Sequence, residues 1–154
     1  MKRILFLILF ILSCTAEQEI DVGSYGNYYF KNNISIESED DIFLFVQDYL
    51  EYKSEEKNYW QTPEESFQLK AGDCDDHAIF EMYLLKEKLG VESEMVVING
   101  QDGLHCVVLV DGKYRDSTNC QKIFFNPDIH MVIPYGEVMW MAFYYHDSVG
   151  KYSH

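Results

Sequence analysis

The order of helical and strand-like segments predicts an α+β fold in which helices precede an antiparallel sheet. Helix start signals and apolar residues at helical spacing occupy positions 38–89. After Gly90 the pattern changes to short apolar runs separated by Asn-Gly and Asp-Gly pairs, which are typical of strands joined by tight turns. Helices early and strands late in the chain indicate an α+β arrangement rather than alternating strands and helices.

Two start signals introduce the first helices. Ser38-Glu39-Asp40-Asp41 forms a capping box with Asp41 in the position usual for Glu, and apolar residues at helical spacing follow it. Thr62-Pro63-Glu64-Glu65 places Thr at the N-cap, Pro at the first helical position and Glu at the third. We expect this second helix to end near Leu69, with Ala71-Gly72 as a turn.

A third helix is predicted to begin after Asp73, which would be its N-cap and would put Cys74 in its first turn. Gly90 is the expected stop, and the buried stripe comprises Ala78, Met82, Leu85 and Leu89. Strands are expected at Glu94–Ile98, Leu104–Val110, Lys113–Ser117, His130–Ile133 and Val138–Tyr145.

One hairpin can be placed in register from the sequence alone. Asp111-Gly112 fits a two-residue type I′ turn, so Val107 should face Asp116 on the next strand. His105 shares a face with Val107, because residues two apart on a strand point the same way. Asp116 is then a diagonal neighbour of His105, within reach of its side chain. A carboxylate beside an imidazole fixes its tautomer and stabilises the imidazolium.

This pair predicts a role for Cys74, although the neighbouring aspartates should disfavour a thiolate. A helix N-terminus and a nearby imidazolium both lower the pKa of a thiol. We therefore expect Cys74 to be a nucleophile, His105 its general base and acid, and Asp116 the carboxylate that orients the imidazole. The backbone N–H of Cys74 could stabilise the oxyanion, with Gln68 or Trp60 as a further donor.

Simpler interpretations stand beside this one. Cys74 could be an inert buried thiol, His105 a hydrogen-bonded strand histidine and Asp116 the first residue of a turn. Trp60 fits a core position, and Gln68 fits the surface equally well. A zinc site made from Cys74, His77, His105 and Cys106 is disfavoured, because adjacent strand residues face opposite sides of a sheet.

Trp60, Pro63-Glu64, the stretch Gly72–Ala78, His105 and Asp116 together resemble the transglutaminase-like superfamily, in particular the bacterial transglutaminase-like cysteine proteinases. The resemblance covers roughly Trp60 to Asn119. It implies a papain-type fold, with the nucleophile at a helix end packed against an antiparallel sheet that carries His and Asp. It also implies thiol chemistry on peptide or Gln-type amides, with a protein or peptide as substrate and no required cofactor.

Some relatives in that proteinase family bind calcium through acidic residues near the cysteine. The resemblance therefore implies a possible calcium site at Asp73, Asp75 and Asp76. The other interpretation is a solvated helix start, in which Asp73 caps the backbone while Asp75 and Asp76 point outward.

The N-terminus has the pattern of an export signal. Lys2 and Arg3 precede an apolar run, Ile4–Leu12, that is too short to span a bilayer. Ile11-Leu12-Ser13-Cys14 resembles a bacterial lipobox, so we expect a signal peptide at 1–13, lipidation of Cys14, a tether at 14–35 and one domain at 36–154. This predicts a lipid-anchored protein of the bacterial cell envelope; the alternative is ordinary cleavage after Ala16.

The formal net charge of −14 argues against a nucleic-acid partner, since such partners are bound mostly through Lys and Arg. If Cys14 is lipidated, Cys74, Cys106 and Cys120 remain, and at least one of the three must be unpaired. Cys106 faces Ser117 in the predicted register, so we expect Cys106 and Cys120 to be buried or free. Two further functions stay open: a non-catalytic binding module with this fold, and a transferase that joins Gln to amines.

Overall fold

The computed structural model describes residues 36–54, 59–100, 103–118 and 127–150, with side chains up to Tyr144. The expected signal peptide, Cys14, the tether and Cys120 lie outside the described residues. The helices are α2 (Glu39–Tyr49), α3 (Pro63–Leu69), α4 (Cys74–Leu84) with a final π-helical turn η1 (Leu85–Leu89), and α5 (Tyr135–Gly150). The strands are β1 (Glu51–Tyr52), β2 (Ala71–Gly72), β3 (Glu94–Gly100), β4 (Gly103–Val110), β5 (Lys113–Arg115) and β6 (Ile129–Pro134).

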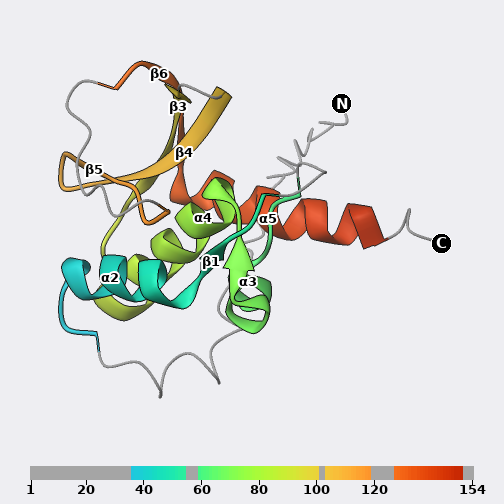
Figure 1. The fold of residues 1–154 in the computed structure, drawn as a ribbon, viewed down its shortest axis with the longest axis horizontal. Coiled ribbons are helices and arrows are strands. Elements are labelled where there is room, and N and C mark those ends of the chain that lie inside the picture. The colour runs from blue at the N-terminus through green and yellow to red at the C-terminus, as the bar shows by residue number, and fades with distance from the viewer. Residues whose placement is uncertain (1–35, 55–58, 101–102, 119–126, 151–154) are drawn as a thin grey trace, which may run out of the picture.

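The main sheet has four strands in the order β5-β4-β3-β6, and each neighbouring pair is antiparallel. The helices gather on one side of this sheet, with α4 between it and α2 (Figure 1). The core between helices and sheet includes Met95, Val97, Cys106, Val108, Val110 and Ile133 from the strands. The predicted α+β architecture, helices packed on an antiparallel sheet, is confirmed.

Helix α4 is the central element, because it packs against β4, α2 and α3. All its residues from Asp75 to Leu84 are buried, so it has no solvated face. A helix enclosed in this way is held by packing on every side. The residue at its exposed beginning, Cys74, is therefore carried on a rigid support.

The predicted helix starts are confirmed. Ser38 with Asp41, Thr62 with Glu65, and Asp73 with Asp76 each form a capping box, in which the side chain of one residue accepts from the backbone of the other. Such caps satisfy N–H groups that have no partner within the helix.

The predicted hairpin is also confirmed. Asp111 and Gly112 have φ angles of 48° and 71°, as a type I′ turn requires, and Val110 pairs with Lys113. The register continues through Val108 and Arg115, as predicted.

The predicted strand at Val138–Tyr145 is wrong, because this run lies within the helix α5. Its buried residues, Val138, Met139 and Ala142, recur at helical spacing. Trp140 and Tyr144, four residues apart, stack with ring centroids 4.7 Å apart on the exposed side. A short apolar run does not distinguish a strand from a helix by composition, and here the spacing decides.

Ala71-Gly72 is a short strand rather than a simple turn, and β2 pairs in parallel with β1. Lys70 takes the left-handed conformation at the end of α3, so the chain reverses one residue earlier than expected. A Cβ on Gly72 would lie 2.5 Å from the Cβ of Asp76. Glycine at this position lets the chain pass close to the first turn of α4.

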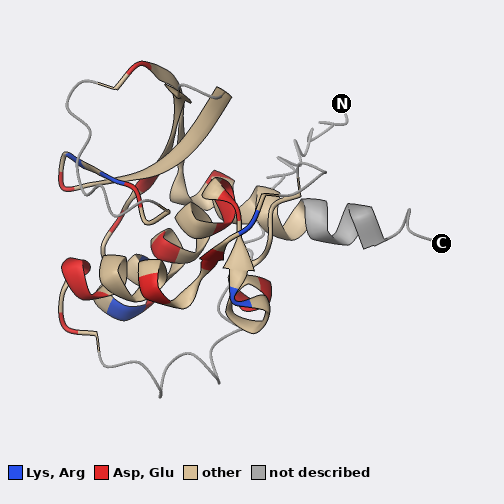
Figure 2. Ribbon diagram, in the orientation of Figure 1, with Lys and Arg blue, Asp and Glu red and all other residues tan. Residues whose placement is uncertain are grey.

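Acidic residues are spread over the helices and loops, and few basic residues lie among them (Figure 2). None of the helices in the described ranges is both long enough and apolar enough to cross a bilayer.

Candidate functional site

Cys74 is the first residue of α4 and is partly exposed. Asp73 caps the helix, and its Oδ1 accepts from the backbone N–H of Asp75 at 3.2 Å. The side chain of Asp73 also accepts from the backbone N–H of Asp76. The cap therefore leaves the backbone N–H of Cys74 unused in this turn. The N-terminal end of the helix therefore offers a backbone donor beside the sulfur.

His105 and Asp116 are in contact, as the hairpin register predicts. Nε2 of His105 lies 2.9 Å from Oδ2 of Asp116, and the side chain of Asp116 is 2 % exposed. Oδ1 of Asp116 accepts from the backbone N–H and the hydroxyl of Thr118, at 3.0 Å and 2.6 Å. Burial acts against ionisation of Asp116, but the hydrogen bonds from His105 and Thr118 hold its pKa below the usual value.

His105 and Cys74 each shift the pKa of the other, so the imidazole lies near the sulfur as well as near Asp116. The hydrogen bond to Asp116, and then the one to Cys74, raise the pKa of His105 to about 10. The hydrogen bond from the Cys106 thiol is the largest influence on Cys74; burial opposes it, His105 reinforces it, and the pKa of Cys74 falls to about 5. Between these two values the pair is a thiolate and an imidazolium.

Cys106 was not expected at this site. It lies on β4 immediately after His105, is buried in the core between the sheet and the helices, and is the largest influence on the pKa of Cys74. The contact with Cys74 and burial together raise the pKa of Cys106 far above its usual value, so Cys106 is the protonated partner. The side chain of Cys106 lies on the sheet face that packs against α4, the face opposite to that of His105.

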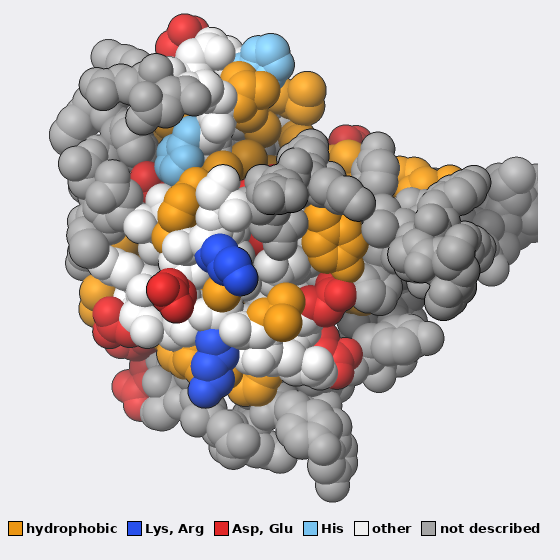
Figure 3. Space-filling model, turned by 45° about the vertical axis from the view of Figure 1, so that its right-hand side comes forward, with side chains coloured by type: hydrophobic (Ala, Val, Ile, Leu, Met, Phe, Trp, Pro, Cys, Tyr) orange, Lys and Arg blue, Asp and Glu red, His pale blue; other side chains and the backbone are white. Residues whose placement is uncertain are grey.

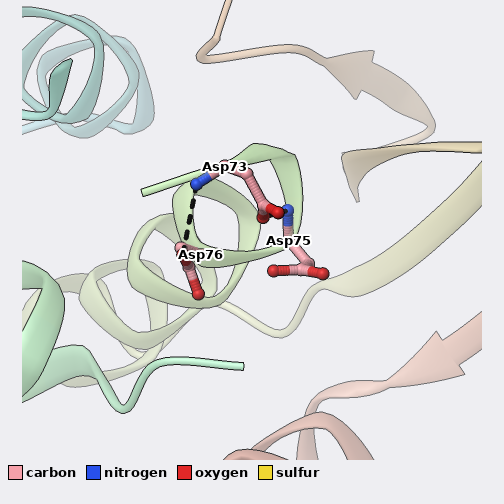
Figure 4. Close-up of side chains that lie close together, drawn as sticks. All are labelled: Asp73, Asp75 and Asp76. Atoms are coloured by element: carbon pink, nitrogen blue, oxygen red, sulfur yellow. Dashed lines mark hydrogen bonds between the residues drawn. The ribbon is translucent and has the colours of Figure 1, made fainter. Parts of the chain in front are cut away.

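The aspartates beside Cys74 are buried, so the expectation that Asp75 and Asp76 point outward into solvent is wrong. Asp76 is 0 % exposed and accepts from the backbone N–H groups of Gln61 and Asp73, at 2.7 Å and 3.1 Å. Figure 4 shows the carboxylates turned toward the same end of α4. Asp76 ties the segment before α3 to the start of α4, and this tie explains its burial.

Asp75 is the least satisfied of these carboxylates. It is 6 % exposed, and its Oδ1 atom has no hydrogen-bond partner among the described residues. Burial, and then the hydrogen bond with Asp73, raise the pKa of Asp75 to about 10. One carboxylate oxygen from each of Asp73, Asp75 and Asp76 lies within 4.8 Å of the others, and among the described residues this is the group with metal-binding spacing. Oxygen ligands and an orphaned buried carboxylate fit a hard cation such as calcium.

Two further buried polar residues of α4 lie near Asp116, and their side-chain polar atoms have no hydrogen-bond partner among the described residues. His77 and Glu81, one turn apart on α4, are 2 % and 0 % exposed and lie beside Ser117. Burial lowers the pKa of His77, and burial raises the pKa of Glu81 to about 7. Arg115 is ion-paired with Glu39 of α2 at 2.8 Å, which fixes the residue before Asp116 to the helices.

Gln68 and Trp60 do not join this group. Gln68 is exposed on α3, and its amide donates to Glu64 at 3.1 Å, so the oxyanion donor expected there is directed elsewhere. Trp60 is partly buried and packs against the main hydrophobic core, which matches its structural interpretation.

The side chains beside His105 are apolar. His105 pairs across β4 and β3 with Ile98, and Ile98 pairs with Ile129 on β6, so the three side chains share one face. Ile129 is 44 % and Leu104 59 % exposed. Hydrophobic side chains gather beside histidines on the face in Figure 3. A cavity of about 440 Å³ lies at the other end of the sheet, and Ser93, Asp111 and Tyr135 are among its lining residues.

No protein-family model and no curated protein matches the chain. Two solved structures of LapG from Legionella pneumophila are similar to it. The EGTA-treated form aligns at a TM-score of 0.50 with 19% identity, over 62% of this chain and 59% of that chain. The other LapG structure aligns at 0.47 with 17% identity, over the same shares. The first likeness shows a transglutaminase-like fold, and the chain spans less than two thirds of the length of LapG.

Proposed function

We propose that the protein is an exported, membrane-tethered thiol peptidase or amidase that acts on peptide or Gln-type amide bonds. Cys74 is the nucleophile, His105 the general base and acid, and Asp116 the residue that orients His105. The observation that carries this proposal is the 2.9 Å contact between His105 and Asp116, with Cys74 at the start of α4 near enough to His105 for each to shift the pKa of the other.

The proposed reaction begins with attack of the Cys74 thiolate on the carbonyl carbon of the amide. The oxyanion that forms is stabilised by the backbone N–H of Cys74 at the start of α4, where the helix dipole also favours negative charge. His105 then gives its proton to the leaving nitrogen, and a thioester to Cys74 results. In the second half, His105 takes a proton from water, which attacks the thioester and releases the acid.

Asp116 keeps its role throughout this cycle because its two oxygens are occupied by His105 and Thr118. It is buried and cannot turn away, so Nε2 of His105 stays bound and the opposite side of the ring is available to Cys74. The exposed Ile129, on the same sheet face as His105, favours substrates with an apolar residue near the scissile bond.

A calcium ion held by Asp73, Asp75 and Asp76 is part of the proposal. The fit rests on the unpartnered oxygen of Asp75 and on the spacing of the three carboxylates. The ion would supply positive charge where three acidic groups meet, and would fix the turn that carries Cys74. Lipidation of Cys14 and a location in the bacterial cell envelope complete the proposal; they rest on the pattern of residues 1–14.

A non-catalytic module with this fold is the alternative. A fully buried sulfur with an unperturbed thiol would favour that alternative, whereas Cys74 is partly exposed and its pKa is lowered with His105 among the causes. These observations favour the enzyme. Transfer to an amine instead of water would use the same residues.

The test is the rate of alkylation of Cys74 by iodoacetamide at mildly acidic pH, read by peptide mass spectrometry. We expect Cys74 to react well above the rate of a free model thiol at pH 6, and Cys106 in the same sample to stay unmodified. His105→Ala should reduce the rate to that of the model thiol, and His130→Ala on β6 is the matched control. A Cys74 that reacts no faster than the model thiol would contradict the proposal.

A further inference from the structure

The cavity of about 440 Å³ lies where β3 and α5 begin and β4 and β6 end, and the proposed peptidase chemistry does not use it. Its volume is within the range of small-molecule sites. Val110, which lines the cavity, is five residues from His105 on the same strand. At a rise of about 3.4 Å per residue, this separation places the cavity roughly 17 Å from His105. The cavity is therefore a separate site.

The lining of this cavity is acidic. It contains Glu92, Glu94 and Asp111, and none of its lining residues is Lys, Arg or His. Glu92 is ion-paired with Lys86. Neither Glu94 nor Asp111 forms an ion pair within the described ranges. The start of α5 brings partial positive charge to the cavity, but Glu137 in its first turn offsets that charge. The cavity is thus complementary to a cation.

Glu94 has an apolar residue on either side. It is the first residue of β3 and pairs with Leu109 of β4 and with Pro134 of β6, and both of these residues line the cavity. Residues directly opposite each other on antiparallel strands share a face, with their Cβ atoms about 5 Å apart. Tyr135 adds an aromatic ring to the lining. A cation bound to Glu94 would therefore have apolar groups along its stem.

Ser93 gives independent support for a ligand. It lines the cavity and is 6 % exposed, and its hydroxyl oxygen has no hydrogen-bond partner among the described residues. A buried polar group without a partner destabilises a folded chain, and an N–H donor in the cavity would provide the missing partner. A metal ion fits less well, because the carboxylates with metal-binding spacing in the described part of the chain belong to the group at the start of α4.

We propose that this cavity binds an organic cation: an ammonium or guanidinium group on a short apolar stem, as in lysine and arginine side chains and in free alkylamines. Glu94 binds the charged group, and the Ser93 hydroxyl accepts one of its N–H groups. The stem lies against Leu109, Pro134 and Tyr135. This site goes beyond the proposed function and does not depend on it, because none of the cavity residues belongs to the peptidase site.

The experiment titrates the isotope-labelled full chain with n-butylguanidinium and follows the backbone amide resonances by NMR. n-Butylammonium, the butyrate anion and neutral n-butanol are titrated in parallel, because they carry similar stems with different charges. We expect both cations to give saturable shifts at Leu109, Gly112 and Gly136, which line the cavity, and the anion and the alcohol to give none. Equal shifts with n-butanol would overturn the proposal, as would cation shifts that do not include these three residues.

Two peptides distinguish the sources of the cation. Acetyl-Ala-Arg-Ala-amide carries the guanidinium group on a side chain, and acetyl-Ala-Ala-Ala-amide is its neutral control. If the arginine peptide binds tighter than n-butylguanidinium by about tenfold or more, the ligand is a basic side chain of a peptide or protein. If the gain is smaller, the ligand is a free alkyl cation. Both results support a cation site, whereas equal binding of the two peptides would contradict it.

Glu94→Gln tests the charged contact. It keeps the size of the side chain and removes its charge, so the dissociation constant of n-butylguanidinium should rise about fivefold. Glu51→Gln on β1 is the matched control, since Glu51 is exposed and lies outside the cavity. It should bind the cation as the unaltered chain does. Equal weakening by both substitutions would show that only the net charge of the chain attracts the cation, and would overturn the site.

Ser93→Ala tests the hydroxyl with two readouts. Loss of the acceptor should weaken binding of n-butylguanidinium about threefold, and loss of an unpartnered buried hydroxyl should raise the thermal unfolding midpoint of the ligand-free chain. A residue with a purely structural role would not give this combination. A lower midpoint with unchanged affinity would overturn the assignment of Ser93 as an acceptor.

Discussion

Nε2 of His105 lies 2.9 Å from Oδ2 of Asp116, and the second oxygen of that carboxylate is bound by Thr118. The histidine is thus held from one side by a buried carboxylate, and its pKa is raised by Asp116 and then by Cys74. Because the pKa of Cys74 is lowered to about 5 and that of His105 raised to about 10, the thiolate–imidazolium pair exists in the pH interval between them. The site is therefore poised for nucleophilic chemistry at neutral pH.

Replacing Asp116 with Asn should lower the upper limit of the pH interval in which the thiolate–imidazolium pair exists. The hydrogen bond to Asp116 is the largest cause of the raised pKa of His105, so the imidazolium should lose its proton at lower pH in Asp116→Asn. We expect the rate of any amide hydrolysis to fall by about 10²–10⁴-fold. The measurement is the pH profile of Cys74 alkylation. Asp111→Asn, in the hairpin turn, is the control, and an unchanged profile for Asp116→Asn would show that Asp116 does not act on His105.

Gly72 should not tolerate a side chain. In Gly72→Ala the added Cβ would lie 2.5 Å from the Cβ of Asp76, at the start of a helix that cannot move away because it is buried on all sides. We expect a loss of about 1–3 kcal/mol in the free energy of unfolding, the usual cost of overpacking. Chemical denaturation measures it. Gly136→Ala in α5 is the matched control, because an added Cβ there meets no atom within 4 Å.

Replacing Asp75 in the carboxylate cluster should change stability in opposite directions without and with calcium. Without a bound cation the pKa of the buried Asp75 is raised to about 10, so Asp75 stays protonated in the folded chain. In the unfolded chain it ionises above about pH 4, and this difference destabilises the folded state above that pH. Asp75→Asn should therefore raise the melting temperature in EGTA. In calcium the unaltered chain should gain stability and the variant should gain much less, because a ligand has been lost. Equal stabilisation of both proteins by calcium would place the ion elsewhere.

The local part of this structure could be predicted from the sequence. The caps at Ser38, Thr62 and Asp73 depend on residues three apart, and the Asp111-Gly112 turn fixes the register that brings Asp116 to His105. Each of these relationships is decided within a few residues, so sequence spacing is sufficient to find it.

The rest depends on tertiary contacts. Aspartates at a helix start usually face water, and only the packing of the Gln61 segment against α4 buries Asp76. Cys106 was assigned to the opposite face from His105. Strand alternation gives the direction of a Cβ but not the position of the partner atom, here the sulfur on another element. The sequence signal that could have pointed to Cys106 is its position immediately after His105, the expected general base.

The buried Glu81 makes the last prediction, on stability against pH. Its folded pKa is raised to about 7 from 4.5, mainly by burial, so the unfolded chain releases this proton first as pH rises. Glu81 therefore destabilises the folded state least below about pH 4.5. The destabilisation increases up to about pH 7, where it reduces the free energy of unfolding by of order 3 kcal/mol. Glu81→Gln keeps the size of the side chain and removes this titration. We expect the variant to be more stable than the unaltered chain at pH 8 and to lose most of that advantage at pH 5, as measured by urea unfolding at both values. The exposed Glu137→Gln in α5 should show no such difference. An advantage that is equal at both pH values would mean that Glu81 acts through packing alone, and that its ionisation does not oppose folding.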